Sequence, residues 1–196
     1  AWGECSGVGG GRYNWTDGRY GTIAGGDSNR NIDCDYGAIG GGYRNSVEDA
    51  DYGTVSGGRL NDVSAGYGTV GGGLYNLVDD QYGTIAGGDS NHAEGPHSAI
   101  GGGGLNCVDN NAGYGTVVGG RADSVRALYG TAGSGYSNLV GDAADDTATV
   151  IAGGWDNTAT GKFNFLGGGY QNNSSNNYSV VVGGRGNTAN GPQASI

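Results

Sequence analysis

One ten-residue phrase, Tyr-Gly-Thr-Ile-Ala-Gly-Gly-Asp-Ser-Asn, occurs at residues 20–29 and again, unchanged, at 82–91. Variants of it fill the chain and define 12 units, most of which start 15 or 16 residues apart. Their first positions are Cys5, Tyr20, Tyr36, Tyr52, Tyr67, Tyr82, His97, Tyr114, Tyr129, Ala148, Phe163 and Tyr178. A unit this short cannot bury a core by itself, so the units must stack on one another as a solenoid.

Two apolar columns run through the repeat, one at the fourth position and one eight residues further on. In the second unit we expect Ile32 in the second column, after a one-residue insertion. Two columns predict two short strands per coil, stacked at about 4.8 Å. The expected fold is all-β, a single-domain parallel β-solenoid of about 12 coils. Residues 1–4 are the N-terminal lead or cap, 5–192 the repeats, and 193–196 the start of an incomplete thirteenth repeat.

The composition excludes several other classes of protein. Glycine supplies 47 of the 196 residues but proline only 2, so neither collagen nor a helical protein is expected. The 13 tyrosines and the steady supply of Val and Ile argue against a disordered linker. A net charge of -10 disfavours nucleic acid as a partner, and no apolar run is long enough for a membrane span.

Nearly every unit contains a glycine pair followed by an asparagine. The seventh position is always glycine, the sixth is glycine in all units but one, and the tenth is asparagine except at Asp123. We expect the glycines to form a tight corner with positive φ. We expect the asparagines to tolerate the left-handed region and to stack as a structural ladder of amides rather than as a ligand site. The ladder comprises Asn29, Asn45, Asn61, Asn76, Asn91, Asn106 and Asn138.

If the fourth position points into the core, the first, third and fifth positions point outward. The fifth is nearly always small, and the first and third form an uncharged face of tyrosines and threonines. Two interpretations follow: the face associates with another copy of the chain, or it binds ice through its regular Thr and small residues. The face residues are Tyr20, Thr22, Tyr36, Tyr52, Thr54, Tyr67, Thr69, Tyr82, Thr84, Tyr114, Thr116, Tyr129 and Thr131.

The remaining residues predict no catalytic, cofactor-binding or metal-binding site. His92 and His97 lack the paired spacing of a metal site, and no glycine stretch carries the ending of a phosphate-binding loop. The acidic loops, the longest of which contains the insertion at 141–146, are interpreted as solvated charges rather than as calcium ligands. We therefore expect no enzyme activity, no cofactor and no metal. Among the three cysteines, Cys107 is the candidate for an intermolecular disulfide.

The repeat resembles the head repeats of YadA-like trimeric autotransporter adhesins, and also the G-G-x-x-N-x-A repeats of other bacterial surface and phage-fibre proteins. The segments that carry the resemblance are 98–101, 178–183 and 187–189, and it covers residues 5–196. It implies a left-handed parallel β-roll, usually trimeric, whose surface binds host matrix or other cells. The chain departs from that family in its paired glycines and in having neither heptads for a stalk nor an anchor segment.

The function expected is that of a non-catalytic extracellular structural protein, either a self-associating fibre subunit or an adhesive head; the alternative is an ice-binding protein. Its partner would be itself, as a homotrimer or filament, together with a cell-surface, matrix or glycan ligand. Ala1 suits a secreted chain after removal of a signal peptide, and the end in mid-repeat at Ile196 predicts end-to-end contacts in a fibre.

Overall fold

The computed structural model describes residues 3–142 and 145–196, and within them all regular structure is β-strand. The chain divides into two compact units, residues 1–93 and residues 94–196. Ala1, expected to be a mature N-terminus, and residues 143–144 of the longest insertion lie outside the described residues. Across the described residues there is no helix with the length and apolarity needed to cross a membrane.

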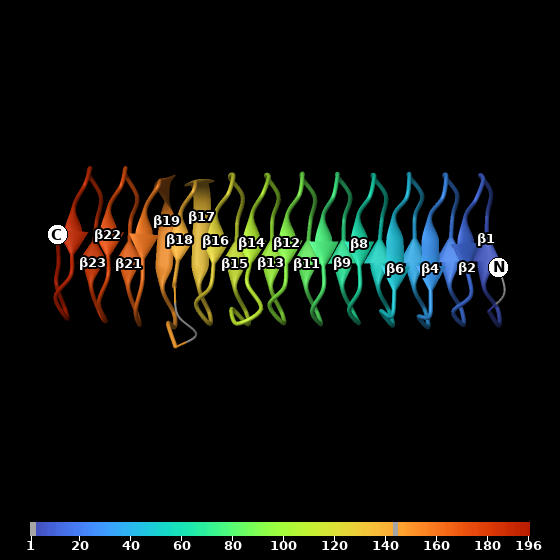
Figure 1. The fold of residues 1–196 in the computed structure, drawn as a ribbon, viewed down its shortest axis with the longest axis horizontal. Coiled ribbons are helices and arrows are strands. Elements are labelled where there is room, and N and C mark those ends of the chain that lie inside the picture. The colour runs from blue at the N-terminus through green and yellow to red at the C-terminus, as the bar shows by residue number, and fades with distance from the viewer. Residues whose placement is uncertain (1–2, 143–144) are drawn as a thin grey trace. The chain divides into compact units, whose positions relative to one another are not determined.

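Residues 1–93 form six coils, each with two short strands (Figure 1). Odd-numbered strands pair in parallel along a first sheet in the order β1-β3-β5-β7-β9-β11, and even-numbered strands along a second sheet in the order β2-β4-β6-β8-β10-β12. The strands are β1 Gly7–Val8, β2 Trp15–Thr16, β3 Thr22–Ile23, β4 Arg30–Ile32, β5 Ala38–Ile39, β6 Ser46–Glu48, β7 Thr54–Val55, β8 Asp62–Val63, β9 Thr69–Val70, β10 Leu77–Val78, β11 Thr84–Ile85 and β12 His92–Ala93.

Residues 94–196 form six further coils with the same two-sheet pattern, β13 to β23 in the first sheet and β14 to β24 in the second. The last residues continue the repeat, because Ala194 and Ile196 exchange backbone hydrogen bonds with β23. The strands are β13 Ala99–Ile100, β14 Cys107–Val108, β15 Thr116–Val117, β16 Ser124–Val125, β17 Thr131–Tyr136, β18 Leu139–Val140, β19 Val150–Trp155, β20 Thr158–Ala159, β21 Phe165–Leu166, β22 Asn173–Ser174, β23 Val180–Val181 and β24 Thr188–Ala189.

The core of each unit consists of the two apolar columns. Ile23, Ile39 and Val55 from the first sheet face inward and are at most 2% exposed, and Val47 and Val63 from the second sheet are fully buried. The residues that flank each buried position point outward, as expected for a strand. The predicted β-solenoid, with two strands per coil and twelve coils in total, is therefore confirmed.

The expectation for Ile32 is wrong. Asn31 pairs with Val47 in the register of the second sheet and is fully buried, whereas Ile32 lies partly exposed beside Glu48. Asn31 Nδ2 donates to Gly37 O over 2.6 Å, and Asn31 Oδ1 accepts a hydrogen bond from Cys34 Sγ. Hydrogen bonding satisfies the amide inside the core, so the extra residue of this coil lies after the column rather than before it.

The corners contain residues with positive φ, as predicted for the glycines. The ladder asparagines do not have positive φ, so the expectation that they occupy the left-handed region is wrong. Gly26 has a φ of +93°, and a Cβ there would lie 2.3 Å from the carbonyl oxygen of Gly42. The left-handed residues are the ones just before the ladder, such as Ser28 with a φ of +60°, and the tyrosine column. Tyr20, Tyr36 and Tyr52 have φ values of +58° to +60°. The tyrosines therefore mark a second set of corners.

Candidate functional site

The side chains of the asparagine ladder form hydrogen bonds that join adjacent coils, as expected for a structural role. Asn61 Nδ2 donates to Gly57 O and Gly73 O, both over 3.0 Å, and Asn61 Oδ1 accepts from the backbone nitrogen of Asn76 over 3.0 Å. The side chain thus joins the corner of its own coil to the next coil and is fully buried. Corresponding bonds are made by Asn29, Asn45, Asn76, Asn91, Asn106 and Asn138.

Asp123 interrupts the ladder of residues 94–196. Its Oδ1 accepts hydrogen bonds from the backbone nitrogen and from Nδ2 of Asn138, each over 2.8 Å. Its Oδ2 is buried and has no hydrogen-bond partner in the described structure. Burial raises the pKa of this carboxyl above its usual value, while the bonds from Asn138 lower it by less.

The tyrosine column forms a continuous stack in residues 1–93. The rings of Tyr20, Tyr36, Tyr52, Tyr67 and Tyr82 are each 43% to 48% exposed. Successive ring centroids lie 4.8–4.9 Å apart with interplanar angles of at most 10°. This spacing follows from the repeat of one coil. In residues 94–196, His97, Tyr114 and Tyr129 stack in the same way.

The first-sheet face is the surface formed by the residues on either side of each buried position of the odd-numbered strands. In residues 1–93 its central part is a row of threonines: Thr54 pairs with Thr69, and Thr69 with Thr84, in adjacent coils. Its members are Gly7, Gly9, Thr22, Ala24, Ala38, Gly40, Thr54, Ser56, Thr69, Gly71, Thr84 and Ala86. All are uncharged and small, and the predicted Thr residues lie on this face.

The first three coils of this face are hollowed. A shallow hollow of about 470 Å³ lies over β1, β3 and β5 and is lined by Gly7, Gly9, Thr22, Ala24, Ala38 and Gly40, with Val8, Ile23 and Ile39 at its base. Gly7, Gly9 and Gly40 supply no side chains there; Val8 is partly exposed, whereas Ile23 and Ile39 are at most 2% exposed.

In residues 94–196 the side chains on the same face are larger and more apolar. Val150, Phe165 and Val180 pair in register across β19, β21 and β23, and form an outward row of large apolar side chains. Phe165 is 43% exposed, and Val182, two residues after Val180, is 71% exposed. We call Val150, Phe165, Val180 and Val182 the apolar patch. Thr116 and Thr131 precede it along the sheet.

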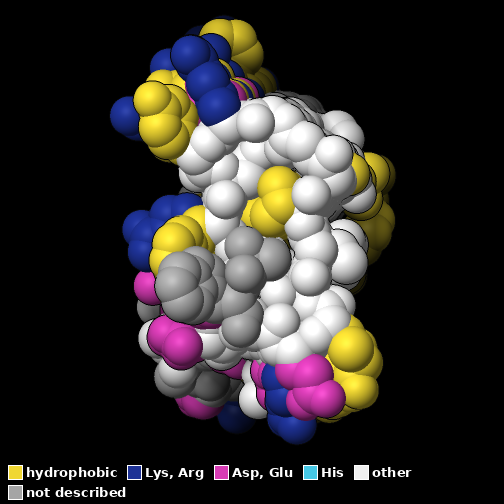
Figure 2. Space-filling view, turned by 90° about the vertical axis from the view of Figure 1, so that its right-hand side faces the viewer, with side chains coloured by type: hydrophobic (Ala, Val, Ile, Leu, Met, Phe, Trp, Pro, Cys, Tyr) yellow, Lys and Arg dark blue, Asp and Glu magenta, His cyan; other side chains and the backbone are white. Residues whose placement is uncertain are grey.

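The outward residues of the second sheet are of a different kind. In residues 1–93 they include Asp17, Arg30, Glu48, Asp62 and Asp79, and in residues 94–196 Glu94, Asp109 and Arg126. Figure 2 shows charged side chains gathered along the left side and lower edge of the view, whereas the right side consists of backbone, uncharged polar and hydrophobic atoms. The second-sheet face is therefore charged in residues 1–93 and up to Arg126, whereas its outward residues from Leu139 to Asn190 are uncharged.

The corners between the sheets carry arginine and aromatic side chains. Arg44 and Arg59 both lie over the ring of Tyr43, with 5.2 and 5.6 Å to its centroid, and Arg185 lies 5.2 Å from the centroid of the Tyr170 ring. Such pairs are attractive by cation–π interaction. The rings of Trp155 and Tyr170 meet edge to face, so they do not form a flat platform.

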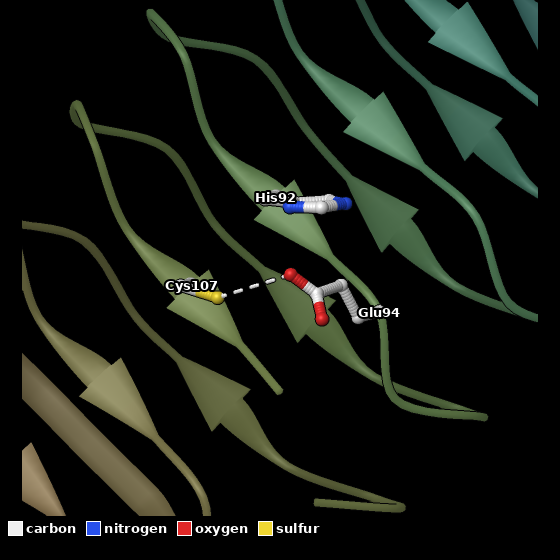
Figure 3. A group of neighbouring side chains, drawn as sticks. All are labelled: His92, Glu94 and Cys107. Atoms are coloured by element: carbon white, nitrogen blue, oxygen red, sulfur yellow. Dashed lines mark hydrogen bonds between the residues drawn. The ribbon is translucent and has the colours of Figure 1, made fainter. Parts of the chain in front are cut away.

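The three cysteines, all within the described residues, are free thiols in different environments. Cys5 is exposed, whereas Cys34 is buried. Cys107 is half-buried and donates a 3.7 Å hydrogen bond to Glu94 Oε1 (Figure 3). Burial raises the pKa of the Cys107 thiol to about 12, and the neighbouring Glu94 adds to the shift. The intermolecular disulfide through Cys107 stays a prediction.

The two histidines occupy ordinary positions of the repeat. His92 Nε2 lies 3.1 Å from Asp79 Oδ2 on the second-sheet face, and His97 stacks on Tyr114 in the tyrosine column. The structure therefore places the threonines and tyrosines at the surface and the asparagines within it. The repeat gives no signal for the apolar patch, because Val150, Phe165 and Val180 stand at the third position, where threonine is the most frequent residue.

No protein-family model matches this chain, and a search of curated proteins finds no match either.

Proposed function

We propose that this protein is a non-catalytic, extracellular structural protein that assembles with copies of itself through its first-sheet face. The observation that carries the proposal is the contrast between the two sheets. Among the described residues, the first-sheet face has no charged side chain in any of its twelve coils, whereas the second-sheet face carries charged side chains from Asp17 to Arg126 and none around the strands from Leu139 to Ala189. Solvent-exposed surfaces rarely lack charge over such an extent, and an uncharged surface with apolar members is typical of a protein interface.

The overall charge supports the same choice of face. Residues 1–93 carry five arginines against twelve carboxylates, and residues 94–196 four basic against seven acidic side chains. Two copies that met through their charged faces would bring carboxylates together, and this repulsion costs free energy. The first-sheet face avoids that cost. A homotrimer, which the resemblance to adhesin heads implies, or a filament would cover it.

Self-association is tested by light scattering and electron microscopy of the purified protein over a range of concentrations. Thr69→Arg places a charge on the first-sheet face, and Ser64→Arg, on the exposed second-sheet face of the neighbouring coil, is its matched control. We expect assemblies with wild type and Ser64→Arg and their loss with Thr69→Arg. A wild-type protein that stays monomeric at high concentration contradicts the proposal.

A second candidate function is ice binding, which the row of Thr54, Thr69 and Thr84 favours. Their hydroxyl groups repeat at the spacing of one coil on a flat, uncharged surface. Thermal hysteresis of the wild type, lost in Thr69→Tyr and Thr84→Tyr, would support this function. Absence of hysteresis in the wild type would remove it.

An adhesive role would use the corner residues rather than the sheet faces. Arg44, Arg59 and Tyr43 are exposed and of the types common at recognition surfaces. We propose a cell-surface, matrix or glycan ligand there, and binding of the wild type to a glycan array, lost in Tyr43→Ser, is the measurement that tests it.

A further inference from the structure

Two arginines of residues 1–93 have no carboxylate partner, although this unit carries twelve carboxylates against five arginines. Each of the other three arginines pairs with one carboxylate: Arg12 with Asp27, Arg19 with Asp35, and Arg30 with Glu48. Arg44 and Arg59 make no ion pair with any described residue of the unit, and both are exposed. Their charges are therefore open to an anion from outside the chain.

One aromatic ring holds both of these arginines. Arg44 follows Tyr43 in the chain, and Arg59 pairs with Tyr43 in parallel from the next coil. Their guanidinium carbons lie 5.2 and 5.6 Å from the centroid of the Tyr43 ring. A cation–π contact orients a guanidinium group without neutralising its charge, so the two groups lose less side-chain freedom when they bind a ligand. We call Tyr43, Arg44 and Arg59 the arginine corner.

A polar hollow lies beside the arginine corner and includes Arg44. It has a volume of about 490 Å³, within the usual range for sites that bind small ligands. Ser46 has a short side chain between Arg30 and Asp62, its partners in the register of the second sheet, so the surface is recessed there. The hydroxyl, amide and carboxylate groups of the lining are hydrogen-bonding partners for sugar hydroxyls. The lining residues are Ser28, Arg30, Arg44, Asn45, Ser46, Glu48 and Asp62.

The formal charges that line the hollow balance. Arg30 and Arg44 stand against Glu48 and Asp62, and Arg30 Nη2 lies 4.0 Å from Glu48 Oε1. Burial raises the pKa of the Asp62 carboxyl, and the neighbouring Glu48 adds to the shift. An acidic group bound at the arginine corner therefore meets no net negative charge from the hollow. Most other charges of the unit are negative, which confines an acidic ligand to this corner.

We propose that the arginine corner binds the acidic groups of an acidic polysaccharide, either carboxylates or sulfate esters, while sugar hydroxyls occupy the hollow. The inference rests on the adhesive role proposed above for these corner residues and names the class of its glycan. Guanidinium groups bind carboxylates and related oxyanions through two parallel hydrogen bonds. Arg44 and Arg59 belong to neighbouring coils, about 4.8 Å apart, which is close to the length of one sugar residue in an extended chain. Acidic groups on consecutive sugars can therefore reach both arginines.

Fluorescence anisotropy with three labelled oligosaccharides of equal length tests this assignment. An oligogalacturonate carries only carboxylates, a sulfated cello-oligosaccharide carries only sulfates, and the unmodified cello-oligosaccharide is neutral. Arg44→Gln and Arg59→Gln each remove one charge from the corner. Arg19→Gln, at an exposed arginine that pairs with Asp35, is the matched control, and Tyr43→Leu removes the ring but keeps both charges. Circular dichroism checks that each variant is folded.

Wild type should bind at least one acidic probe, more weakly as the salt concentration rises, and should not bind the neutral probe. We expect each corner arginine variant to raise the Kd about tenfold or more, Tyr43→Leu to raise it about threefold, and Arg19→Gln to leave it within about twofold. The two acidic probes distinguish a carboxylate from a sulfate ligand. An equal loss with Arg19→Gln, or no binding of either acidic probe, overturns the assignment. Binding of neutral glycans alone would leave the adhesive role standing, whereas no binding of any glycan removes both.

Discussion

The carboxylate of Asp123 accepts two hydrogen bonds from Asn138, from the backbone nitrogen and from Nδ2, each 2.8 Å long. It occupies a ladder position where neighbouring coils have an amide. The second carboxylate oxygen is buried without a hydrogen bond in the described structure, whereas Nδ2 of Asn106 and of Asn138 each donate to glycine carbonyls at the equivalent place. Asp123 therefore stabilises residues 94–196 less than an asparagine at this position would.

Asp123→Asn is expected to stabilise the protein by about 1–3 kcal/mol at pH 7, because the new amide can donate where the carboxylate cannot. The pKa of Asp123 is raised in the folded state, so folding favours its protonated form. Wild type therefore loses stability relative to the variant as the pH rises above the unfolded pKa of about 3.9 and through the higher folded pKa.

Urea unfolding of both proteins between pH 3 and pH 7 measures this difference. The difference in the free energy of unfolding between Asp123→Asn and wild type should be smallest at acidic pH and should grow as the pH rises. Asp145→Asn changes an exposed carboxylate of the same unit and should show no comparable difference from wild type. An Asp123→Asn variant that is less stable than wild type at pH 7 would contradict the assignment.

Asn61→Ala should destabilise residues 1–93 by about 2 kcal/mol or more. The change leaves the carbonyl of Gly57 and the backbone nitrogen of Asn76 without their partners, whereas the carbonyl of Gly73 keeps the bond from the backbone nitrogen of Arg59; each buried unpaired group costs about 1–3 kcal/mol. Chemical denaturation compares it with Asn110→Ala, an exposed asparagine outside the ladder. A loss below about 1 kcal/mol would mean that the ladder is not a main source of stability.

Tyr67 tests the strain in the tyrosine column. Its φ is +61°, a region where residues with a Cβ are disfavoured by about 1 kcal/mol or more, while its ring stacks between Tyr52 and Tyr82. Both Tyr67→Ala and Tyr67→Gly lose the stacking, but only glycine relieves the strain. We expect the glycine variant to unfold at the higher temperature, the reverse of the usual order for these two residues. The usual order would refute the left-handed assignment.

The thiols should label in a fixed order with a thiol-specific reagent. Cys5 is exposed, whereas burial raises the pKa of both Cys34 and Cys107 to about 12. Only the thiolate reacts, so Cys34 and Cys107 should react slowly at pH 8 and faster as the pH approaches 12. Mass spectrometry of the labelled protein identifies each site, and rapid labelling of Cys107 in native protein would contradict its placement beside Glu94.

The repeat was sufficient to predict the architecture of each unit, because its period gives the coil and its two apolar columns give the two strands. The error at Ile32 has a physical reason. An apolar residue was preferred over Asn31 for the core, but Asn31 is satisfied there by Gly37 and Cys34. Hydrogen bonding inside a core depends on three-dimensional neighbours and cannot be read from the type of one residue.

The sequence predicts which residues form the candidate face, but not how their side chains shape its surface. Alternation along the strand places Thr69 and Thr84 outward, as the sequence predicted. The repeat also aligns Val150, Phe165 and Val180, which stand 15 residues apart at the third position of their units, but it does not give the exposure of these side chains or of Val182. The left-handed tyrosines were also missed, because tyrosine has no sequence signal for positive φ.

The central claim is that the first-sheet face is covered by another copy of the chain. Hydroxyl-radical footprinting in dilute and concentrated solution tests it most directly, because it reports the exposure of single side chains. We predict that Phe165 and Val182 become protected as the concentration rises, while Trp15, which is 44% exposed on the second-sheet face, labels equally throughout. Unchanged labelling of Phe165 and Val182 in protein that has associated, or protection of Trp15 instead, would contradict the account.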